Sequence, residues 1–179
     1  MPAPTPLIRP SLEADVPAMT AIYAKAVLTG RASFEIDAPD ETEIARRRSD
    51  VLAKGLPWLT AELDGAVLGY AYASPFRPRL AYRYTLEDSI YVHEAARGRG
   101  LGRLLLAELL ARCEALGARQ MIAAIGDSAN QASIAVHAAA GFVPVGTYRN
   151  VGRKFEQWLD VVLMQRTLGP GAALPPAAG

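Results

Sequence analysis

The chain has 179 residues, and its hydrophobic share of 51% and charged share of 21% are typical of a soluble globular protein. Its net charge of +1 gives no broad basic field, which makes nucleic acid an unfavourable partner. The single cysteine, Cys113, excludes an internal disulfide, and no segment is long and apolar enough to cross a membrane. Because the N-terminus lacks the charged and apolar regions of a signal peptide, we expect a cytoplasmic protein.

We expect one domain over residues 7–168, because this length buries a single core and no repeat or linker divides it. Residues 1–6 and 169–179 are rich in Pro, Gly and Ala, which predicts flexible tails.

The first part of this domain predicts a strand and two helices. Residues 7–9 favour a short strand, and the apolar residues between 16 and 26 recur at the spacing of a buried helix face. Residues 28–39 form a loop in which Phe34 either covers the core or walls a pocket. A second helix is expected over residues 41–52, where charged and apolar residues lie on different sides.

Strand patterns follow these helices. Residues 58–62 and 67–72 flank an Asp-Gly pair at 64–65, which is typical of a tight hairpin turn. Residues 74–79 form a basic loop that two prolines stiffen. Residues 82–92 are expected to form a long strand, because β-branched and aromatic side chains are frequent there.

The second half predicts alternating helices and strands. A leucine-rich helix over residues 101–116 precedes a continuous apolar run at 120–125, which indicates a central buried strand. A further helix over 128–140 is followed by strands over 142–148 and 154–168. This order predicts a mixed α/β fold with one partly antiparallel sheet of about six to seven strands, flanked by about four helices.

A glycine-rich turn joins the long strand to the leucine-rich helix. Its three glycines let successive N–H groups point at one spot, and the helix N-terminus there favours an anion. Three arginines add positive charge, so a phosphate or pyrophosphate fits, although an ordinary basic turn has the same features. The residues of this turn are Arg97, Gly98, Arg99, Gly100, Leu101, Gly102 and Arg103.

The spacing within this turn excludes two common phosphate-binding motifs. A dinucleotide fingerprint requires a third glycine where Arg103 stands, and a Walker A loop requires Gly-Lys-Ser/Thr at its end. The turn instead resembles the pyrophosphate loop of GNAT superfamily N-acetyltransferases, in which Arg97, Gly100 and Gly102 match the motif.

Two sets of polar residues lie in otherwise apolar elements. Asn130, Ser133 and His137 share one helical face and require partners from protein, water or ligand, unless they form a solvated stripe. Glu87 and Asp88 are adjacent in a strand, so their side chains point to opposite faces and at most one lines a given cleft. No cluster of His, Cys and Asp has the spacing of metal ligands, so we expect no metal.

Further stretches make the resemblance specific to the phosphinothricin and methionine sulfoximine acetyltransferases, over roughly residues 8–168. The stretches that match are Leu56–Leu59, Gly69–Ala73, Ala81–Ser89, Arg97–Gly102, Ile125–Asp127 with Asn130 and His137, Gly141–Phe142 and Trp158–Val161.

The resemblance implies a GNAT fold whose sheet splays at the site of acetyl-CoA. The pantetheine arm would pair with the backbone of Ile90 and Val92, near Tyr91, and would meet Asn130 with Ser133 on the last helix. The pyrophosphate would rest on the glycine turn. Many members carry a tyrosine on the last helix as general acid, and this chain has none between residues 128 and 141. Members usually form homodimers.

The family's catalytic carboxylate corresponds to Glu87, and its conspicuous histidine to His137. An amine attacks a thioester only as the free base, so a base such as Glu87 must take a proton from a group of pKa near ~10. A backbone N–H near Tyr91 or Val92 is the expected donor to the oxyanion.

The acceptor is expected to be a small amino-acid-like amine. Phosphinothricin and methionine sulfoximine carry a carboxylate and an oxygen-rich head, which require cations and apolar walls. The candidate residues are Arg77, Arg79 and Arg83 as cations and Phe34, Tyr72 and Tyr82 as walls, beside Glu87. The arginines can equally form a solvated basic loop. A protein N-terminus or polyamine as acceptor, and a non-catalytic acyl-CoA-binding module, are the alternative functions.

Overall fold

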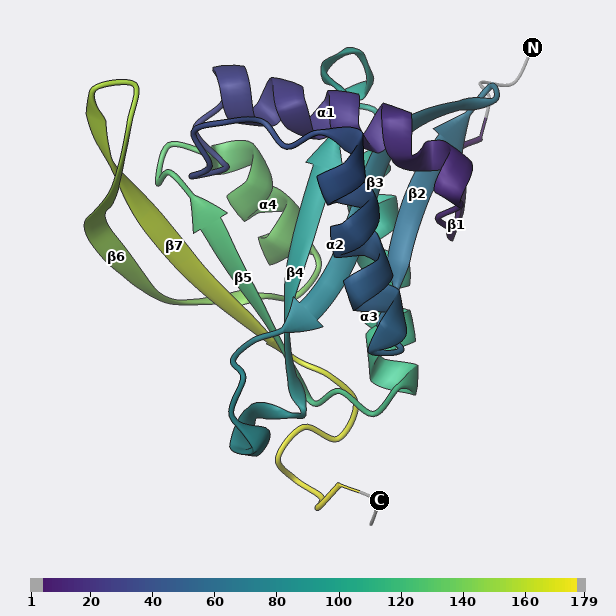
Figure 1. Cartoon of the computed structure of the whole chain (residues 1–179). Coiled ribbons are helices and arrows are strands. Elements are labelled where there is room, and N and C mark those ends of the chain that lie inside the picture. The colour runs from purple at the N-terminus through teal and green to yellow at the C-terminus, as the bar shows by residue number, and fades with distance from the viewer. Residues whose placement is uncertain (1–4, 177–179) are drawn as a thin grey trace.

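The computed structural model describes residues 5–176, in which seven strands form one sheet that helices cover on both faces (Figure 1). The strands are β1 (Leu7–Pro10), β2 (Trp58–Leu63), β3 (Ala66–Pro75), β4 (Thr85–Val92), β5 (Gln120–Gly126), β6 (Val143–Lys154) and β7 (Gln157–Thr167). The helices are α1 (Val16–Thr29), α2 (Glu41–Ala53), α3 (Leu101–Ala115) and α4 (Gln131–Ala139), with 3-10 turns η1 (Glu13–Asp15), η2 (Leu80–Tyr82) and η3 (Glu94–Ala96). The predicted mixed α/β fold is confirmed.

The sheet has the order β1-β2-β3-β4-β5-β7-β6, and its neighbours are antiparallel except for the central pair β4 and β5. Only Thr85–Glu87 at the start of β4 pair with Gln120–Ile122 of β5. Beyond that point they diverge toward the top of Figure 1, with α4 beside the opening. The sheet is therefore splayed at its centre, as expected.

Two apolar cores lie on opposite faces of the sheet. On one face α1 and α2 pack on Trp58 and Tyr70, which are 2% and 1% exposed. On the other face the leucines of α3 pack with Leu86, Met121 and Met164. Because successive side chains of a strand alternate between faces, β4 contributes to both cores and to the walls of the opening between them.

Several element boundaries differ from the sequence-based expectation. Strand β4 begins at Thr85 and not at Tyr82. The N–H groups of Tyr82 and Arg83 donate to carbonyls three residues earlier, so these residues form a turn and do not pair with a neighbouring strand. Helix α4 begins only after Asn130, whose side chain accepts from the N–H of Ser133. Strand β6 runs to Lys154, well past residue 148. The Asp-Gly turn is confirmed, with φ of +51° and +76° at residues 64 and 65.

The hairpin of β6 and β7 extends beyond the helices in Figure 1, and β6 forms an edge of the sheet. Large apolar side chains on it are exposed: Val143, Val145, Tyr148, Val151, Phe155 and Trp158.

The predicted tails lie partly outside the described residues, which exclude 1–4 and 177–179. Residues 169–172 form turns, and the Arg119 guanidinium donates to the carbonyls of Gly171 and Pro175. Among the helices of residues 5–176, none has the length and apolarity that a membrane crossing requires.

Candidate active site

A cleft of about 720 Å³ occupies the opening between β4 and β5. Its walls come from the end of β4, the N-terminus of α3, the end of β5, α4 and the loop after α1. The predicted site residues that line it are Ile90, Tyr91, Val92, Arg97, Gly98, Gly100, Leu101, Gly102, Arg103, Asn130, Ser133 and His137. Arg99 does not line it. The size suits an extended small-molecule ligand.

The backbone of β4 offers unused hydrogen-bonding groups to this cleft. His93 donates to the Leu68 carbonyl and Phe76 donates to the Thr85 carbonyl, so odd-numbered residues of β4 bond to β3. The N–H and C=O groups of Ile90 and Val92 therefore point the other way, where β5 has already diverged. An extended chain with amides can pair with them. The N–H of Tyr91 faces β3, which leaves Val92 as the better placed of the two expected oxyanion donors.

The glycine turn closes one end of the cleft. Gly98 and Gly100 have φ of +74° and +81°, a conformation that other residues adopt only with strain, and Gly100 forms the N-cap of α3. Arg97 and Arg103 line the cleft beside the first turn of the helix. A cluster of N–H groups, a helix N-terminus and two guanidinium groups together fit a pyrophosphate.

Asp88 and His137 lie at the other end of the cleft. The Nε2 of His137 is 3.0 Å from Oδ1 of Asp88, and its Nδ1 is 2.7 Å from the Ser133 carbonyl oxygen. The two side chains are 3% and 5% exposed. Burial alone would lower the pKa of His137, but the hydrogen bond and charge of Asp88 outweigh burial and raise it. Sequence patterns did not reveal this contact, because the residues are 49 positions apart.

Glu87 lies on the opposite face of β4, with the aromatic residues that pack beneath α1 and α2. Burial raises its pKa, the neighbouring Asp88 carboxylate raises it further, and the charge of Arg77 opposes both. The half-buried Glu87 does not line the cleft. The two adjacent carboxylates thus point to different faces, as the alternation of a strand predicts.

Cys113 of α3 is completely buried, and burial together with the Asp88 charge raises its pKa to about 12. Its thiol is therefore protonated at neutral pH and is not a nucleophile.

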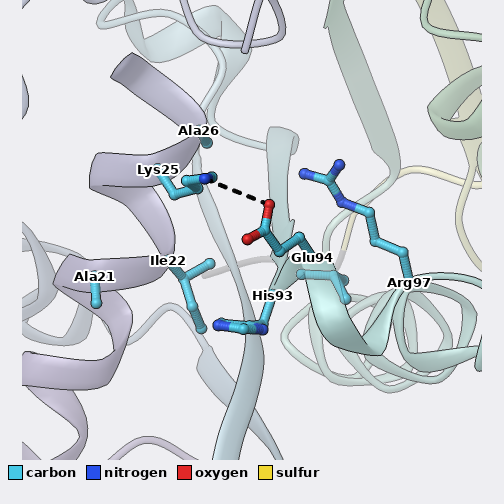
Figure 2. Close-up of a pocket in the computed structure, with 8 residues that line it drawn as sticks. Ala21, Ile22, Lys25, Ala26, His93, Glu94 and Arg97 are labelled. Atoms are coloured by element: carbon cyan, nitrogen blue, oxygen red, sulfur yellow. Dashed lines mark ion pairs between the residues drawn. The ribbon is translucent and has the colours of Figure 1, made fainter. Parts of the chain in front are cut away.

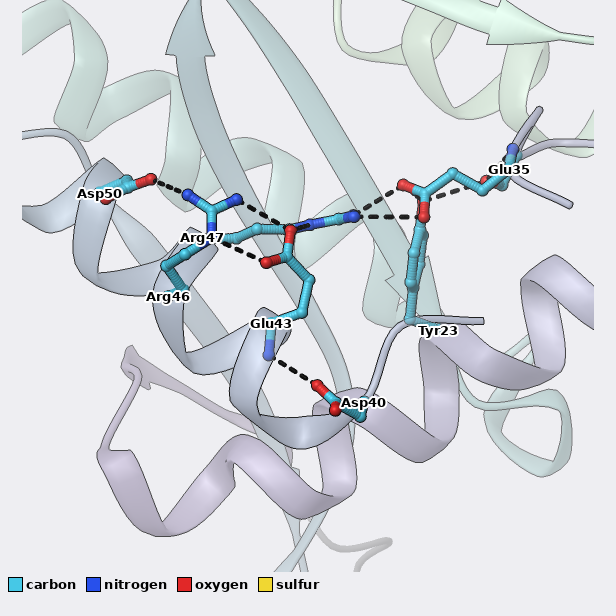
Figure 3. Close-up of polar contacts among 8 residues, drawn as sticks. Tyr23, Glu35, Asp40, Glu43, Arg46, Arg47 and Asp50 are labelled. Atoms are coloured by element: carbon cyan, nitrogen blue, oxygen red, sulfur yellow. Dashed lines mark hydrogen bonds and ion pairs between the residues drawn. The ribbon is translucent and has the colours of Figure 1, made fainter. Parts of the chain in front are cut away.

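The loop after α1 is anchored through residues 31–35. Glu35 accepts hydrogen bonds from Tyr23 of α1 at 2.8 Å and from Arg47 of α2 at 2.6 Å (Figure 3). Burial alone would raise the pKa of Glu35, but the hydrogen bonds from Arg47 and Tyr23 outweigh it and lower the pKa. The same guanidinium group also bonds Glu43 within α2, so Arg47 links the loop residue Glu35 to this helix.

The same loop contacts the ends of β5 and β6. Arg31 pairs with Asp127 at 3.0 Å, and the buried Lys154 donates to the Ser33 carbonyl at 2.8 Å. The Ala32 carbonyl lies against Gly126, where a Cβ would collide with it. The ring of Phe34 lies against Gly152 in the same way. Phe34 thus packs against the β6–β7 hairpin, and it is not among the residues that line the cleft.

The remaining predicted acceptor residues lie on or near the loop before β4. Arg77 stacks over the ring of Phe76 with 5.0 Å to the centroid, and the Phe76 ring meets Tyr82 edge-on at 5.7 Å. Arg83 stacks over Tyr84 instead, and Arg79 is exposed in front of η2. The ring of Tyr72 lies parallel to Trp58 with centroids 4.2 Å apart. Of the three arginines, Arg77 is the one whose charge acts on Glu87.

A smaller cavity of about 200 Å³ lies beside the cleft, between α1 and the turn after β4. Figure 2 shows Lys25 reaching from α1 toward Glu94, with 3.6 Å between Nζ and Oε2. The cavity shares Val92 and Arg97 with the cleft, so it is an extension of the glycine-turn end. Within residues 5–176, no three His, Cys, Asp or Glu side chains gather as a metal site requires.

Residues 21–142 match the acetyltransferase (GNAT) family. The chain is 57% identical over 157 residues to the phosphinothricin N-acetyltransferase of Alcaligenes faecalis, which covers 88% of this chain and 80% of that protein. It is 41% identical over 172 residues to the L-methionine sulfoximine/L-methionine sulfone acetyltransferase of Pseudomonas aeruginosa, which covers 94% and 98%.

The comparison with solved structures agrees with the comparison of sequences. The crystal structure of a GNAT superfamily phosphinothricin acetyltransferase from Sinorhizobium meliloti, in complex with AcCoA, superimposes with a TM-score of 0.95 at 48% identity. The superposition covers 98% of this chain and 95% of that one. The chain therefore belongs to the GNAT acetyltransferase family and is an N-acetyltransferase.

Proposed function

We propose that the enzyme transfers the acetyl group of acetyl-CoA to the α-amine of a small amino-acid-like molecule of the phosphinothricin or methionine sulfoximine type. The observation that carries this proposal is the 57% identity to the Alcaligenes faecalis phosphinothricin N-acetyltransferase across nearly the whole domain. The splayed cleft supports the same donor, because a ligand with a pyrophosphate at one end and amides along its length matches its groups in order.

The glycine turn would hold the pyrophosphate, and the free backbone groups of Ile90 and Val92 would pair with the amides of the pantetheine arm. Asn130 and Ser133 line the opposite wall, where the amide of Asn130 has donors that its capping bond does not use. Bound acetyl-CoA supplies an acetyl group activated as a thioester. The chain's part is to hold the thioester in register with the amine, which lowers the entropic cost of reaction.

Glu87 is our general base. Its carboxylate is half-buried and forms no ion pair with any of residues 5–176, so it can take up a proton that the attacking amine loses, directly or through one water. Burial and the nearby Asp88 raise its pKa toward the range in which a base exchanges protons readily at neutral pH.

The acceptor would lie on the Glu87 side of β4. Arg77 is the proposed carboxylate ligand, because its planar guanidinium can make two parallel hydrogen bonds to an oxyanion. Arg79, Arg83 and Tyr82 lie in the same loop, and Tyr72 and Phe34 supply apolar surface.

An acceptor comparison tests this proposal. Release of the CoA thiol is measured with phosphinothricin, methionine sulfoximine, free amino acids, a polyamine and a peptide N-terminus. We expect the two analogues to give the highest kcat/KM. Faster acetylation of the polyamine or the peptide would contradict the proposed acceptor, and no thiol release with any amine would contradict the proposed activity.

We further propose that a second copy of the chain covers the exposed apolar face of the β6–β7 hairpin. A large apolar patch on an edge strand is costly when it stays in water. Light scattering should give twice the 19.1 kDa chain mass, and Trp158→Glu, which changes a side chain 63% exposed, should give monomers. A monomeric wild-type protein would contradict the dimer. The cytoplasmic location stays a prediction.

A further inference from the structure

The proposed reaction leaves one proton without a source. The sulfur that departs from the acetyl group must gain a proton, and helix α4 has no tyrosine to give it. Among the titratable side chains that line the cleft, His137 and Asp88 form a closed pair away from the glycine turn. The proton content of this pair follows from its contacts.

The imidazole of His137 faces an acceptor on each side. A carbonyl oxygen cannot donate, so Nδ1, at 2.7 Å from the Ser133 carbonyl, must carry a proton. Between Nε2 and the Asp88 carboxyl oxygen, at 3.0 Å, one further proton is required. Burial lowers the pKa of His137, but the hydrogen bond and charge of Asp88 outweigh burial and raise it, so that proton belongs on nitrogen. The pair is therefore an imidazolium and a carboxylate, with no net charge.

The surroundings stabilise this state. Both side chains are buried, and an uncompensated charge in such a place would be costly. The other groups that face the pair are the protonated Cys113 of α3, the Ser133 hydroxyl of α4 and the Phe142 ring, edge-on to the imidazole at 5.0 Å. Glu87, the adjacent carboxylate in the chain, points to the other face of the strand.

The pair also stands where the reactive end of the donor must lie. The last residue of β4 that pairs with β5 is Glu87, so the cleft begins at Asp88. The glycine turn closes the far end. A ligand whose pyrophosphate rests on that turn and whose arm follows Val92 and Ile90 brings its thioester toward Asp88. The second carboxyl oxygen of Asp88, Oδ2, has no hydrogen-bond partner within the described chain.

We propose that Asp88 is a positioning residue that keeps His137 doubly protonated, and that the Asp88–His137 pair supplies the proton gained by the departing sulfur. This inference rests on the proposed function. As the C–N bond forms and the C–S bond breaks, Glu87 takes the proton lost by nitrogen, and the electron pair of the broken bond stays on sulfur. His137 gives that sulfur the proton on Nε2, so its hydrogen bond to Oδ1 of Asp88 breaks as the S–H bond forms. Afterwards Glu87 releases its proton to water and His137 regains one.

The test begins with the protonation of the imidazole in the free enzyme. The chain has only two histidines, and His93→Gln leaves His137 as the single imidazole signal in nitrogen NMR. We expect both ring nitrogens of His137 to carry protons at pH 7.5, and Asp88→Asn to lose one of them at the same pH. A merely structural Asp88 would not change this signature. A singly protonated His137 in an active wild-type enzyme would overturn this inference and leave the proposed function intact.

Kinetics provide the second measurement. Asp88→Asn and His137→Gln should each lower kcat by about tenfold to hundredfold, the usual range for a lost proton donor, with both KM values changed less than threefold. The alkaline limb of the pH profile of kcat should also shift to lower pH in Asp88→Asn. Asp50→Asn, an exposed carboxylate change on α2, is the matched control.

An unchanged kcat in Asp88→Asn would overturn the inference, whatever the NMR result. If Asp88→Asn fails to fold, wild-type NMR and His137→Gln kinetics decide it by the same criteria. An enzyme that acetylates none of the amines, yet keeps a doubly protonated His137, would contradict the proposed function and with it the proton transfer.

Discussion

The two faces of strand β4 differ most at Glu87 and Asp88, which are neighbours in the chain. Glu87 is half-buried, and the charge of an exposed arginine, Arg77, acts on its pKa. Asp88 is almost fully buried and bound to the imidazole of His137. In the proposed mechanism the first carboxylate accepts a proton, whereas the second holds the imidazole that gives one. The pleat of a single strand would then be enough to separate the proposed proton acceptor from the proposed proton donor.

The change with the largest expected effect removes the acceptor on the first face. Glu87→Gln keeps the shape and should lower kcat by about 10²- to 10⁴-fold, with little change in the KM for acetyl-CoA. In the wild type, kcat/KM should fall as pH drops through the raised pKa of Glu87, because the base then becomes protonated. Glu41→Gln, an exposed change on α2, is the control. A larger loss in Asp88→Asn than in Glu87→Gln would reverse the assignment.

A change in the glycine turn should affect only the binding of CoA, on the Asp88 face of β4. Gly100→Val places a β-branched residue at φ of +81°, a strain of about 1–3 kcal/mol, where the backbone must approach a phosphate. Calorimetry should show CoA binding weakened by about tenfold to hundredfold. Gly117→Val has a similar φ of +87° and equally open space, but lies at the far end of α3. Equal CoA affinity in the two variants would contradict the cofactor assignment.

Arg77→Ala should affect the acceptor on the Glu87 face of β4 and leave the cofactor on the Asp88 face unaffected. Loss of one charge-assisted hydrogen bond should raise the KM for methionine sulfoximine by about tenfold and leave CoA binding unchanged. Because Arg77 lowers the pKa of Glu87, its removal should also move the acid limb of kcat/KM to higher pH. Arg79→Ala, in the same loop, serves as the comparison. An acid limb that stays in place would show that Arg77 and Glu87 do not share a site.

The smallest effect is expected where the loop after α1 is tied to α2. Glu35→Gln weakens a partly exposed ion pair, so it should cost about 1 kcal/mol or less of unfolding free energy. The folded-state pKa of Glu35 is lowered, so its contribution is present at neutral pH and is lost as pH falls through that pKa. The variant should therefore differ from wild type at pH 7 and converge with it in acid. An equal difference in stability at both pH values would contradict this.

Local patterns predicted the order of elements well. The Asp-Gly pair predicted the β2–β3 hairpin, the continuous apolar run at 120–125 predicted β5, and the three glycines predicted the turn before α3. Each of these signals depends on neighbouring residues, so it could be found without knowledge of the tertiary contacts. The alternation of strand side chains was also sufficient to separate Glu87 from Asp88.

Contacts between distant elements could not be predicted in this way. The partner of Asp88 lies on α4, and the anchors of the loop after α1 lie on β5 and β6, because the packing of the sheet brings them together. The start of β4 was wrong for a related reason. Tyr82 has high strand propensity, but η2 forms its own turn bonds there and propensity yields to them.

The central claim is that β4 keeps the two substrates on opposite faces, and a crystal structure with CoA and methionine sulfoximine bound together tests it most directly. We predict that the amine lies within hydrogen-bonding reach of Glu87, directly or through one water, and that the CoA sulfur lies at the Asp88–His137 end of the cleft. A sulfur near the pair with the amine far from Glu87, or both ligands on one face of the strand, would contradict the claim.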